Sequence, residues 1–400
     1  MQTRPIPSYD AAIIGMGPGG AVAAAELSQA GLRVIAFDKE VHPRYKVCGG
    51  GLSARITQVL HLELDSLVER SIYGVRFTYK GQRSHLIESS SPIAYMVMRD
   101  RLDHHLGERA RQSGTDIHQG EAVVGLAQDE DGVDIVTARS RYRAAVVIGA
   151  DGANSLVARQ LFPGRSVHRV PALESEVPVE DDCEIPGARS ILVDIGAASQ
   201  GYGWIFPKQG RLSVGLGEFR LKSSRLRASF ENFVREQEGL AQREVPRPIG
   251  HPIPVFSREG NGERGQAGSL VNGRVLLVGD AGHLVDPLFG EGIYYAVRSG
   301  QLAARAILRT AQEPGRSLQE YEMDVEREIV PEFRVTARIA RVVYGFPYLC
   351  FKLLRKYEPI VQGYFGVLQG RTTAERFLGE AKAKVKASVG ELLLEAVRLR

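Results

Sequence analysis

Three glycines near the N-terminus have the spacing of a phosphate-binding turn. Gly15, Gly17 and Gly20 lie between an apolar run, residues 9–14, and an alanine-rich stretch, residues 21–30. Glycines at these positions permit a tight turn and let the N–H groups of a helix N-terminus approach a pyrophosphate. Asp38 ends the next apolar run, where a carboxylate can accept hydrogen bonds from ribose hydroxyls. The pattern predicts a dinucleotide site, and its alternative is an ordinary strand–helix turn with a solvated aspartate.

A second glycine-rich turn stands far downstream. An apolar strand, residues 274–278, runs into Gly279–Asp280 and then into residues 287–293 (PLFGEGI), which open a long helix. Such a loop aims backbone N–H groups and a helix N-terminus at a ligand, and the N1–C2=O edge of a reduced flavin suits that field. The second turn therefore favours FAD over NAD. The flavin contacts predicted here are Asp280, which is placed to bind the ribityl chain, and Gly290, Gly292 and Ile293.

Residues 46–52 read Lys-x-Cys-Gly-Gly-Gly-Leu. Three consecutive glycines suit a place where the backbone passes close to a flat ring. Cys48, at the edge of this loop, would then face the isoalloxazine and is the candidate catalytic residue. Its alternative is a small buried cysteine beside a flexible loop. The flavin contacts predicted here are Lys46, Cys48, Gly49, Gly50 and Gly51.

Three aromatic residues alternate along one predicted strand. Tyr202, Trp204 and Phe206 share a face because side chains on a strand repeat every second residue. Trp204 is the only tryptophan in the chain. We expect these residues to line a substrate pocket, whereas the alternative is a sheet face packed into the core.

The elements that position these motifs predict an α/β fold. The N-terminal pattern is strand, helix, strand, and further expected elements are a helix at 102–113, a buried strand at 146–148 and a helix at 293–310. We also expect residues 73–79 and 94–98 to pair as antiparallel strands. The segment 164–268 is β-rich, and the chain after Pro314 is helical and basic.

These elements predict a Rossmann-type FAD-binding domain with an inserted β-rich (α+β) substrate domain and a helical C-terminal region. The expected FAD-binding domain is discontinuous. Its segments are 1–72, 97–162 and 270–312; those of the substrate domain are 73–96 and 163–269; the helical region is 313–400.

Composition narrows the class of protein. The 400 residues exceed what one core usually organises, and 44% apolar with 24% charged residues is typical of a soluble globular chain. A net charge of +4 is too small to indicate nucleic-acid binding. Cys48, Cys183 and Cys350 are not a disulfide framework. The chain has no uninterrupted apolar stretch of about 18 residues or more and no signal sequence, so we expect a cytoplasmic protein. No metal site is predicted.

With these motifs the chain resembles the flavoproteins that include p-hydroxybenzoate hydroxylase and, within them, the geranylgeranyl reductases. The shared pattern is the N-terminal glycine motif, Asp151–Gly152 and Gly279–Asp280. The resemblance implies that Arg99 contacts the phosphate side of FAD. It also implies that Asp151 binds FAD and that the backbone of Val123 contacts the adenine.

Two segments are similar to the reductases in particular: the Cys-Gly-Gly-Gly loop and residues 202–207 (YxWxFP). In that family the second motif lines a lipid tunnel. The resemblance covers residues 9–308 and weakens after Pro314. It implies an FAD-dependent reductase that saturates isolated C=C bonds of geranylgeranyl (isoprenoid) chains. Protonation would be combined with hydride from flavin N5, and Cys48 would deliver the proton or position the alkene. His283 and Asp286 are second candidates for the acid.

Two other functions fit the same motifs. A flavin-dependent monooxygenase or halogenase shares the fold, although halogenases carry WxWxIP where this chain has Tyr202 and Phe206. A prenyl-lipid carrier that keeps FAD as a structural group is the alternative outside enzymes. No second Gly-x-Gly-x-x-Gly follows another strand, so the sequence does not mark a separate nicotinamide domain. The resemblance implies NADPH, or a ferredoxin-like or deazaflavin donor, as the electron source.

The segment 338–357 interleaves aromatic with basic residues. Such a segment can lie on an anionic membrane as a peripheral contact. The alternative is a helical lid packed on the substrate domain.

Overall fold

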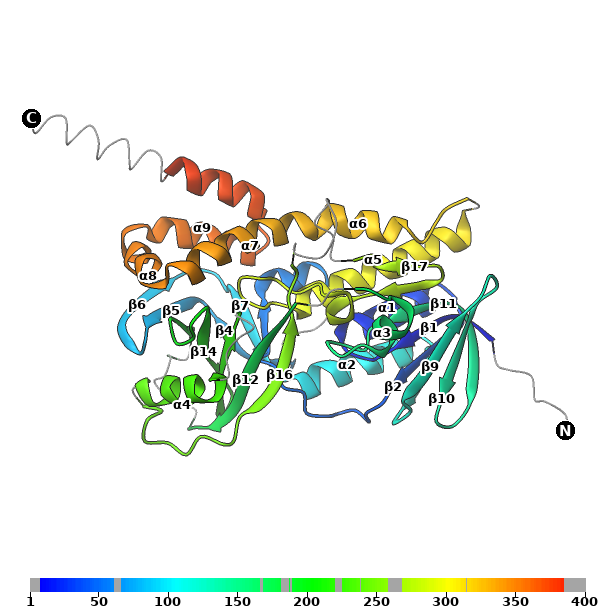
Figure 1. Ribbon diagram of the computed structural model, residues 1–400, viewed down its shortest axis with the longest axis horizontal. Helices are drawn as coiled ribbons and strands as arrows, with labels where there is room; N and C mark the ends of the chain where they lie inside the picture. The colour runs from blue at the N-terminus through cyan, green and yellow to red at the C-terminus, as the bar shows by residue number, and fades with distance from the viewer. Residues whose placement is uncertain are drawn as a thin grey trace, which may run out of the picture.

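The computed structural model describes residues 8–60, 66–165, 168–180, 187, 189–219, 225–237, 239–257, 268–313 and 315–384. Cys183 and the last part of the predicted helical region, residues 385–400, lie outside the described residues. Two large sheets, one small sheet and a layer of C-terminal helices make up the fold (Figure 1).

The first large sheet carries the N-terminal glycine turn. Its central strands run in the order β18–β11–β1–β2–β8 and are all parallel. Parallel strands are covered on both faces, and the last four residues of β1 and all of β2 are accordingly buried. The strands are β1 (Ser8–Ile14), β2 (Val34–Asp38), β8 (Asp116–Gln119), β9 (Val123–Gln128), β10 (Val133–Thr137), β11 (Arg141–Gly149), β17 (Val271–Asn272) and β18 (Val275–Leu277).

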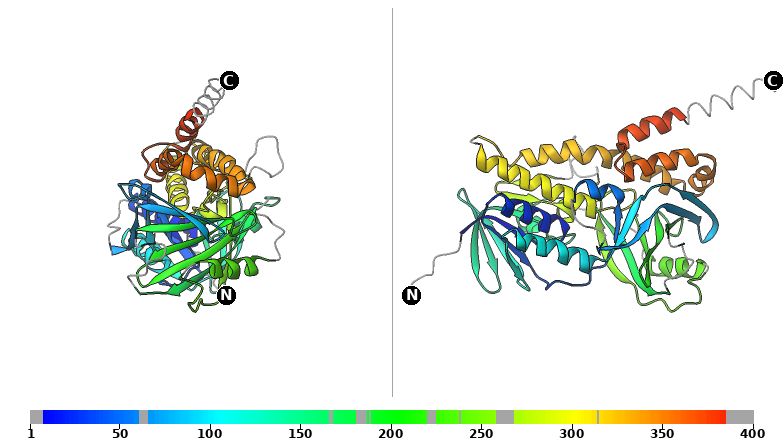
Figure 2. Two further views of the ribbon diagram at one scale, coloured as in Figure 1. Left: turned by 90° about the vertical axis from the view of Figure 1, so that its left-hand side faces the viewer. Right: turned by 180° about the vertical axis from the view of Figure 1, so that it is seen from behind.

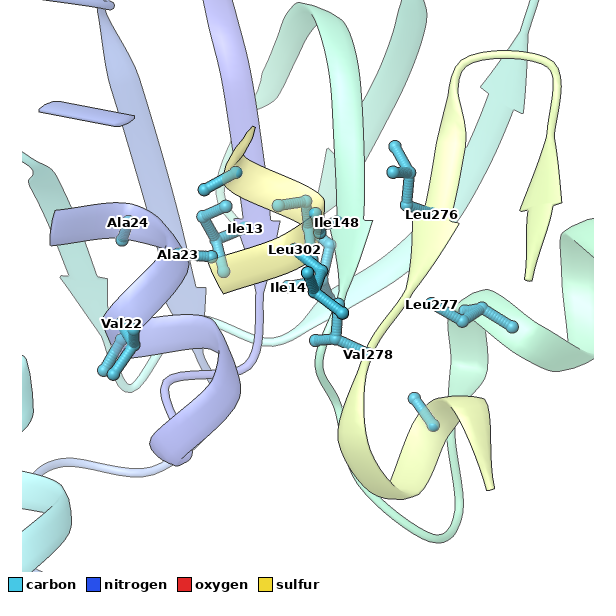
Figure 3. Close-up of a cluster of buried hydrophobic side chains, with 14 of the residues drawn as sticks. Ile13, Ile14, Val22, Ala23, Ala24, Ile148, Leu276, Leu277, Val278 and Leu302 are labelled. Atoms are coloured by element: carbon cyan, nitrogen blue, oxygen red, sulfur yellow. The ribbon is translucent and has the colours of Figure 1, made fainter. Parts of the chain in front are cut away.

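Helices pack closely on this sheet because small residues stand where they meet. Figure 3 shows side chains of α1, α5, β1, β11 and the end of β18 gathered in one buried cluster. A Cβ on Gly300 would lie 2.3 Å from the backbone oxygen of Gly19, so α1 and α5 cross at glycines. The helices associated with this sheet are α1 (Pro18–Gln29), α2 (Arg99–Gln112), α3 (Leu156–Leu161) and α5 (Ile293–Gln312), with the short 3₁₀ helices η1 (Ala54–Gln58) and η3 (Gly279–Gly282).

The second large sheet runs β16–β12–β15–β14–β13–β5–β6. Helix α4 (Leu226–Glu236) covers one face, where Phe230 and Phe233 pack with Ile205. Tyr202 and Trp204 lie on the opposite face, as their period-two spacing predicted. The strands are β5 (Gly74–Tyr79), β6 (Gln82–Glu88), β12 (Arg169–Pro178), β13 (Ser190–Ile195), β14 (Gly201–Lys208), β15 (Arg211–Glu218) and β16 (Ile249–Pro254).

One expected pairing was wrong. Strand β5 pairs with β6 and not with residues 94–98. A two-residue turn at Lys80–Gly81, both with positive φ, closes this hairpin, as such turns do. Strand β7 (Ala94–Val97) instead joins β3 (Gly51–Ser53) and β4 (Val68–Ile72) in the small sheet.

The C-terminal helices lie along one side of the molecule, where α8 contacts β5 and β13 and α9 contacts β6. Figure 2 shows this helical layer from the side and from behind. The helices are α6 (Glu320–Glu328), α7 (Val330–Gly345), α8 (Pro347–Lys356) and α9 (Glu358–Leu368), followed by a helical segment at 374–384. Within the described ranges no helix has the length and apolarity needed to cross a membrane.

The α/β class with a Rossmann-type FAD fold and a helical C-terminal region is thus confirmed. The predicted domain boundaries stay a proposal, in which the first large sheet belongs to the FAD-binding domain and the second to the substrate domain.

Candidate functional site

A cavity of about 1220 Å³ lies between the two large sheets and the C-terminal helices. Pockets for drug-sized ligands occupy roughly 300–1,000 Å³, so this cavity has room for a dinucleotide together with part of a second ligand. All predicted cofactor and substrate residues line it except Gly20. Those residues are Gly15, Gly17, Asp38, Lys46, Cys48, Gly49, Gly50, Gly51, Arg99, Val123, Asp151, Tyr202, Trp204, Phe206, Asp280, Gly290, Gly292 and Ile293.

The N-terminal turn has the backbone that its glycines predict. Gly15 adopts φ +100°, and a Cβ there would lie 2.4 Å from the backbone oxygen of Ala150. Gly17 is the N-cap of α1 and faces open space, which leaves room for a phosphate at the helix N-terminus. Gly20 has a different part, because its Cβ would lie 2.0 Å from the Gly15 oxygen. Gly20 therefore serves the packing of the helix against the turn.

Asp38 is buried at the end of β2. Its carboxylate accepts hydrogen bonds from the backbone amides of Met16 and Glu40, both at 2.9 Å, and lies 3.3 Å from Nε2 of His42. Burial raises the pKa of Asp38, but the His42 and backbone hydrogen bonds outweigh burial and leave the pKa below its ordinary value. The group is thus an ionised acceptor at the place where a ribose is expected.

Asp151 lines the cavity, but much of its carboxylate serves helix α3. It accepts hydrogen bonds from Ser155 Oγ at 2.5 Å and from the backbone amides of Leu156 at 2.6 Å and Val157 at 3.2 Å. Burial raises the pKa of Asp151 above its ordinary value. The structure thus gives Asp151 a part in capping α3, beside its predicted contact with the cofactor.

The Cys-Gly-Gly-Gly loop separates a charged side of the cavity from an aromatic side. Cys48 Sγ accepts a hydrogen bond from the Gly50 amide at 3.4 Å and lies beside the guanidinium of Arg99. Burial, followed by the charge of Arg99, lowers the pKa of Lys46 on the same side. Gly49 faces the other way, because a Cβ there would lie 2.9 Å from the Phe206 ring.

Arg99 and Arg44 give the charged side of the cavity its positive potential. Arg99 binds Asp103 through two hydrogen bonds of 2.8 Å, and Arg44 reaches the same carboxylate at 3.0 Å. Nη1 of Arg44 is buried without a hydrogen-bond partner among the described residues. A buried unpaired guanidinium nitrogen in the wall of a cavity is suited to an anion such as a pyrophosphate.

The downstream turn brings the second predicted flavin segment to the same cavity. Gly290 has φ +66°, and Gly292 is the N-cap of α5. The Glu291 carboxylate accepts a hydrogen bond from Arg55 Nη2 at 2.9 Å, and Arg55 also binds Glu332 of α7 at 2.8 Å. The loop that would face the flavin is therefore tied to the C-terminal helices by a buried ion-pair network.

The aromatic end of the cavity is lined but not filled. The Tyr202 ring lies 5.8 Å from that of Trp204 and 6.5 Å from that of Tyr344, which is parallel within 11°. Tyr202 donates a hydrogen bond of 2.5 Å to the backbone oxygen of Phe289. This bond holds the Tyr202 ring at the wall, and the cavity stays open beside it.

The structure adds residues that the sequence did not indicate. Glu174 of β12 and His251 of β16 line the cavity. Burial, followed by the charge of Lys46, lowers the pKa of His251 to about 4, so the ring is neutral near pH 7. The far end is closed by the C-terminal helices, whose lining residues include Ile339, Val343, Tyr344, Cys350, Leu354, Tyr364 and Phe377. Periodicity places such residues on a face but does not say which cavity that face meets.

The two second-choice acids have different places. Asp286 lines the cavity, and its Oδ1 accepts hydrogen bonds from the backbone amides of Leu288 and Phe289. The side chain therefore stabilises the turn. Burial raises the pKa of Asp286 to about 6. His283 is buried with φ +54° and does not line the cavity.

The residues present fit FAD. A glycine turn at a helix N-terminus, an ionised acid at the end of the next strand and an unpaired buried guanidinium all line one groove, in the order in which pyrophosphate and ribose require them. The backbone loops at Gly49–Gly51 and Gly290–Ile293 both line the cavity, and an isoalloxazine ring would lie between them.

Comparisons with known proteins agree with this geometry. Residues 8–327 match the family model of the FAD binding domain. The chain is 31% identical over 310 residues to geranylgeranyl diphosphate reductase of Rhodobacter capsulatus, covering 75% of each chain. It is also 30% identical over 387 residues to an uncharacterized protein of Methanosarcina barkeri, covering 96% of this chain and 95% of that one.

Solved structures share the fold. A geranylgeranyl bacteriochlorophyll reductase-like protein from Thermoplasma acidophilum has a TM-score of 0.74 at 24% identity, over 84% of this chain and 88% of that one. The flavin-dependent brominase Bmp2 has a TM-score of 0.73 at 18% identity, over 95% of this chain and 100% of that one. The fold alone thus does not separate reductases from halogenases. The family model and the 31% identity to the Rhodobacter enzyme show that the chain belongs to the geranylgeranyl reductase family of FAD-binding flavoproteins and is an FAD-dependent oxidoreductase.

Proposed function

We propose that this protein saturates isolated C=C bonds of a geranylgeranyl chain. The observation that carries the proposal is the single cavity that joins three glycine segments, distant in sequence, to an apolar end lined by aromatic rings and C-terminal helices. The relatives named as geranylgeranyl diphosphate reductases support the same substrate class.

Several of the predicted flavin residues have a defined part in this proposal. The turn at Gly15 and Gly17 would hold the pyrophosphate with Arg99, Asp38 the ribose and Asp280 the ribityl chain. The backbone amides of residues 290–293 would face the N1–C2=O edge. When bound and reduced, FAD supplies a hydride from N5.

The chain's own residues must supply the rest of the chemistry. An isolated trisubstituted alkene has no carbonyl to accept charge, so protonation must accompany hydride addition. Trp204 and Tyr202 present ring faces that stabilise developing positive charge, and the apolar lining of the cavity would keep water from the bound alkene. Cys48 borders the flavin segment and would deliver the proton or position the alkene; Cys48→Ser that retains FAD and full turnover would remove that role.

The deciding experiment is mass spectrometry after anaerobic incubation of chemically reduced enzyme with geranylgeranyl diphosphate. We expect products heavier by whole pairs of hydrogen atoms. Unchanged substrate, with the flavin still reduced, would contradict the proposal.

A flavin-dependent monooxygenase or halogenase is the second candidate, because Bmp2 shares the fold. Formation of product without air separates the two, since an oxygenase or halogenase requires oxygen. Reoxidation of the flavin by the geranylgeranyl compound in the same vessel would also exclude a prenyl-lipid carrier.

We further propose that the protein works as a peripheral membrane enzyme. Helix α8 turns Cys350 and Leu354 into the cavity and exposes Leu349 and Leu353 to solvent, together with Phe346 just before the helix. A helix that lines an apolar cavity and also carries an exposed apolar face offers a prenyl chain a route from a lipid surface. Reduction would come from NADPH or a ferredoxin-like protein, which assays with each donor distinguish.

A further inference from the structure

Glu174 is a buried acid at the substrate end of the cavity. It lies on β12, is 3% exposed and lines the cavity wall. On the neighbouring strand β15 it stands opposite Gly215, and Trp204 of β14 stands opposite the same glycine from the other side. Since Gly215 has no side chain, the Trp204 ring lies over it and the carboxyl and the indole share one stretch of wall.

Glu174 forms no ion pair with any cation among the described residues. Lys208 of β14, whose charge acts on Glu174, binds Glu176 instead, with Nζ to Oε1 at 2.7 Å. The backbone amide of Cys48 faces the Glu174 carboxyl, but Oε1 has no hydrogen-bond partner among the described residues. A buried carboxyl left in this way is held more easily as the neutral acid.

The charges around Glu174 agree with this state. Burial raises its pKa to about 7, and the negative charge of Glu176 on the same strand adds to the increase. Lys208, the Cys48 amide and the Ser213 hydroxyl act in the opposite direction, but burial outweighs them. The half-exposed phenol of Tyr45 also faces this group from the loop before Cys48.

We infer that Glu174 is the acid that protonates the alkene in the reduction proposed above, on which this inference rests. The O–H bond of Glu174 breaks as a C–H bond forms at one alkene carbon. The hydride of the reduced flavin supplies the two electrons and the second hydrogen at the other carbon. The carboxylate that remains regains a proton from solvent before the next turnover.

The other candidates are less well placed for proton transfer. Cys48 Sγ is turned toward Arg99, on the charged side of the loop, which leaves Cys48 the other role proposed above, that of positioning the alkene. Asp286 is engaged by two backbone amides of its own turn. Glu174 faces Trp204 across Gly215, and the ring face of Trp204 stabilises the positive charge that protonation creates.

The experiment compares Glu174→Gln with Glu218→Gln, anaerobically and after chemical reduction of the flavin. Glu218 is a buried glutamate of the same sheet that does not line the cavity. We expect Glu174→Gln to slow the reduction of geranylgeranyl diphosphate by about 10²–10⁴-fold, the usual contribution of a general acid. Glu174→Asp should restore part of the rate, and Glu218→Gln should retain it.

Two readouts do not depend on turnover. FAD affinity and the binding of geranylgeranyl diphosphate should stay within about threefold of wild type in Glu174→Gln, because the amide keeps the shape of the carboxyl. In apoprotein labelled with ¹³C-glutamate, one carboxyl should titrate near pH 7 and disappear in this variant. A full rate in Glu174→Gln, or the absence of that titration, would overturn the inference. Inactive wild-type enzyme with bound substrate would instead overturn the proposed function, and the inference with it.

Discussion

The Trp204 ring lies directly on Gly215 of the neighbouring strand. A Cβ at Gly215 would stand 2.0 Å from Cζ2 of Trp204. The position of the ring therefore depends on the absence of one side chain. We expect Gly215→Ala to displace Trp204 and to lower the free energy of unfolding by about 1–3 kcal/mol, as overpacking in a core does. Since Trp204 is the only tryptophan, its fluorescence emission should shift, and prenyl substrate should bind more weakly.

Gly217→Ala is the matched control. Its Cβ would lie 3.8 Å from Cζ3 of Trp204, an ordinary contact. The free energy of unfolding should change by less than about 1 kcal/mol, with the emission unshifted. Equal effects of the two substitutions would show that the ring does not rest on Gly215.

Arg55 connects the loop under the predicted flavin to helix α7. It is buried between the carboxylates of Glu291 and Glu332 and contacts the Tyr295 hydroxyl at 2.9 Å. Arg55→Met would leave two buried carboxylates without their cation, and breaking such a pair costs about 3–5 kcal/mol. Urea denaturation should show this loss, and FAD should dissociate more readily because the loop loses its anchor.

Arg227→Met tests whether the loss is specific. The Arg227 side chain is 60% exposed and binds Glu231, which is 54% exposed, at 3.1 Å. Exposed pairs of this kind contribute about 0.2–1 kcal/mol. A similarly small effect of Arg55→Met would mean that the network does not hold the loop in solution.

The state of Glu174 should also be visible in stability. Its pKa rises from 4.5 to about 7 in the folded protein. Between these values the folded state keeps a proton that the unfolded state has lost, so the free energy of unfolding falls as pH increases from about 4.5 to about 7. The loss attributable to this group is about 3 kcal/mol at most, at about 1.4 kcal/mol for each pH unit.

Urea midpoints of wild type and Glu174→Gln across this range measure the effect. The difference between the two proteins should change with pH in that window and be constant above it. Parallel curves throughout would show that Glu174 is already ionised in the folded protein.

The local motifs were predictable from the sequence because each depends on neighbouring residues. The turn at Gly15, the face shared by Tyr202 and Trp204, and the start of α5 at Ile293 all follow from short-range spacing. The partner of β5 was missed because the short Lys80–Gly81 turn lies within a longer polar stretch.

Contacts between distant segments could not be predicted in this way. Nothing in the sequence around Glu174 indicates that Trp204 lies two strands away on the same face of the sheet. Nor does it indicate that the Cys48 loop approaches the Glu174 carboxyl. Nor does the periodicity of 338–357 say that Tyr344 and Leu354 face a cavity while Leu353 faces solvent. Such facts depend on how whole sheets and helices pack.

The exposed face of α8 makes the last prediction. Phe346 is 63% exposed, Leu349 53% and Leu353 40%, and Lys352 stands 4.6 Å above the Tyr348 ring. Burying each large apolar side chain in a lipid surface contributes about 1.5–3 kcal/mol. We therefore expect Phe346→Ser with Leu349→Ser to weaken co-sedimentation with anionic phospholipid vesicles by at least about tenfold.

The matched control is Met323→Ser, which removes an equally exposed apolar side chain from α6. It should leave vesicle binding unchanged, because α6 lies outside the lining of the cavity. If the double variant sediments like wild type, the face of α8 does not meet the membrane, and the prenyl chain must enter the cavity elsewhere.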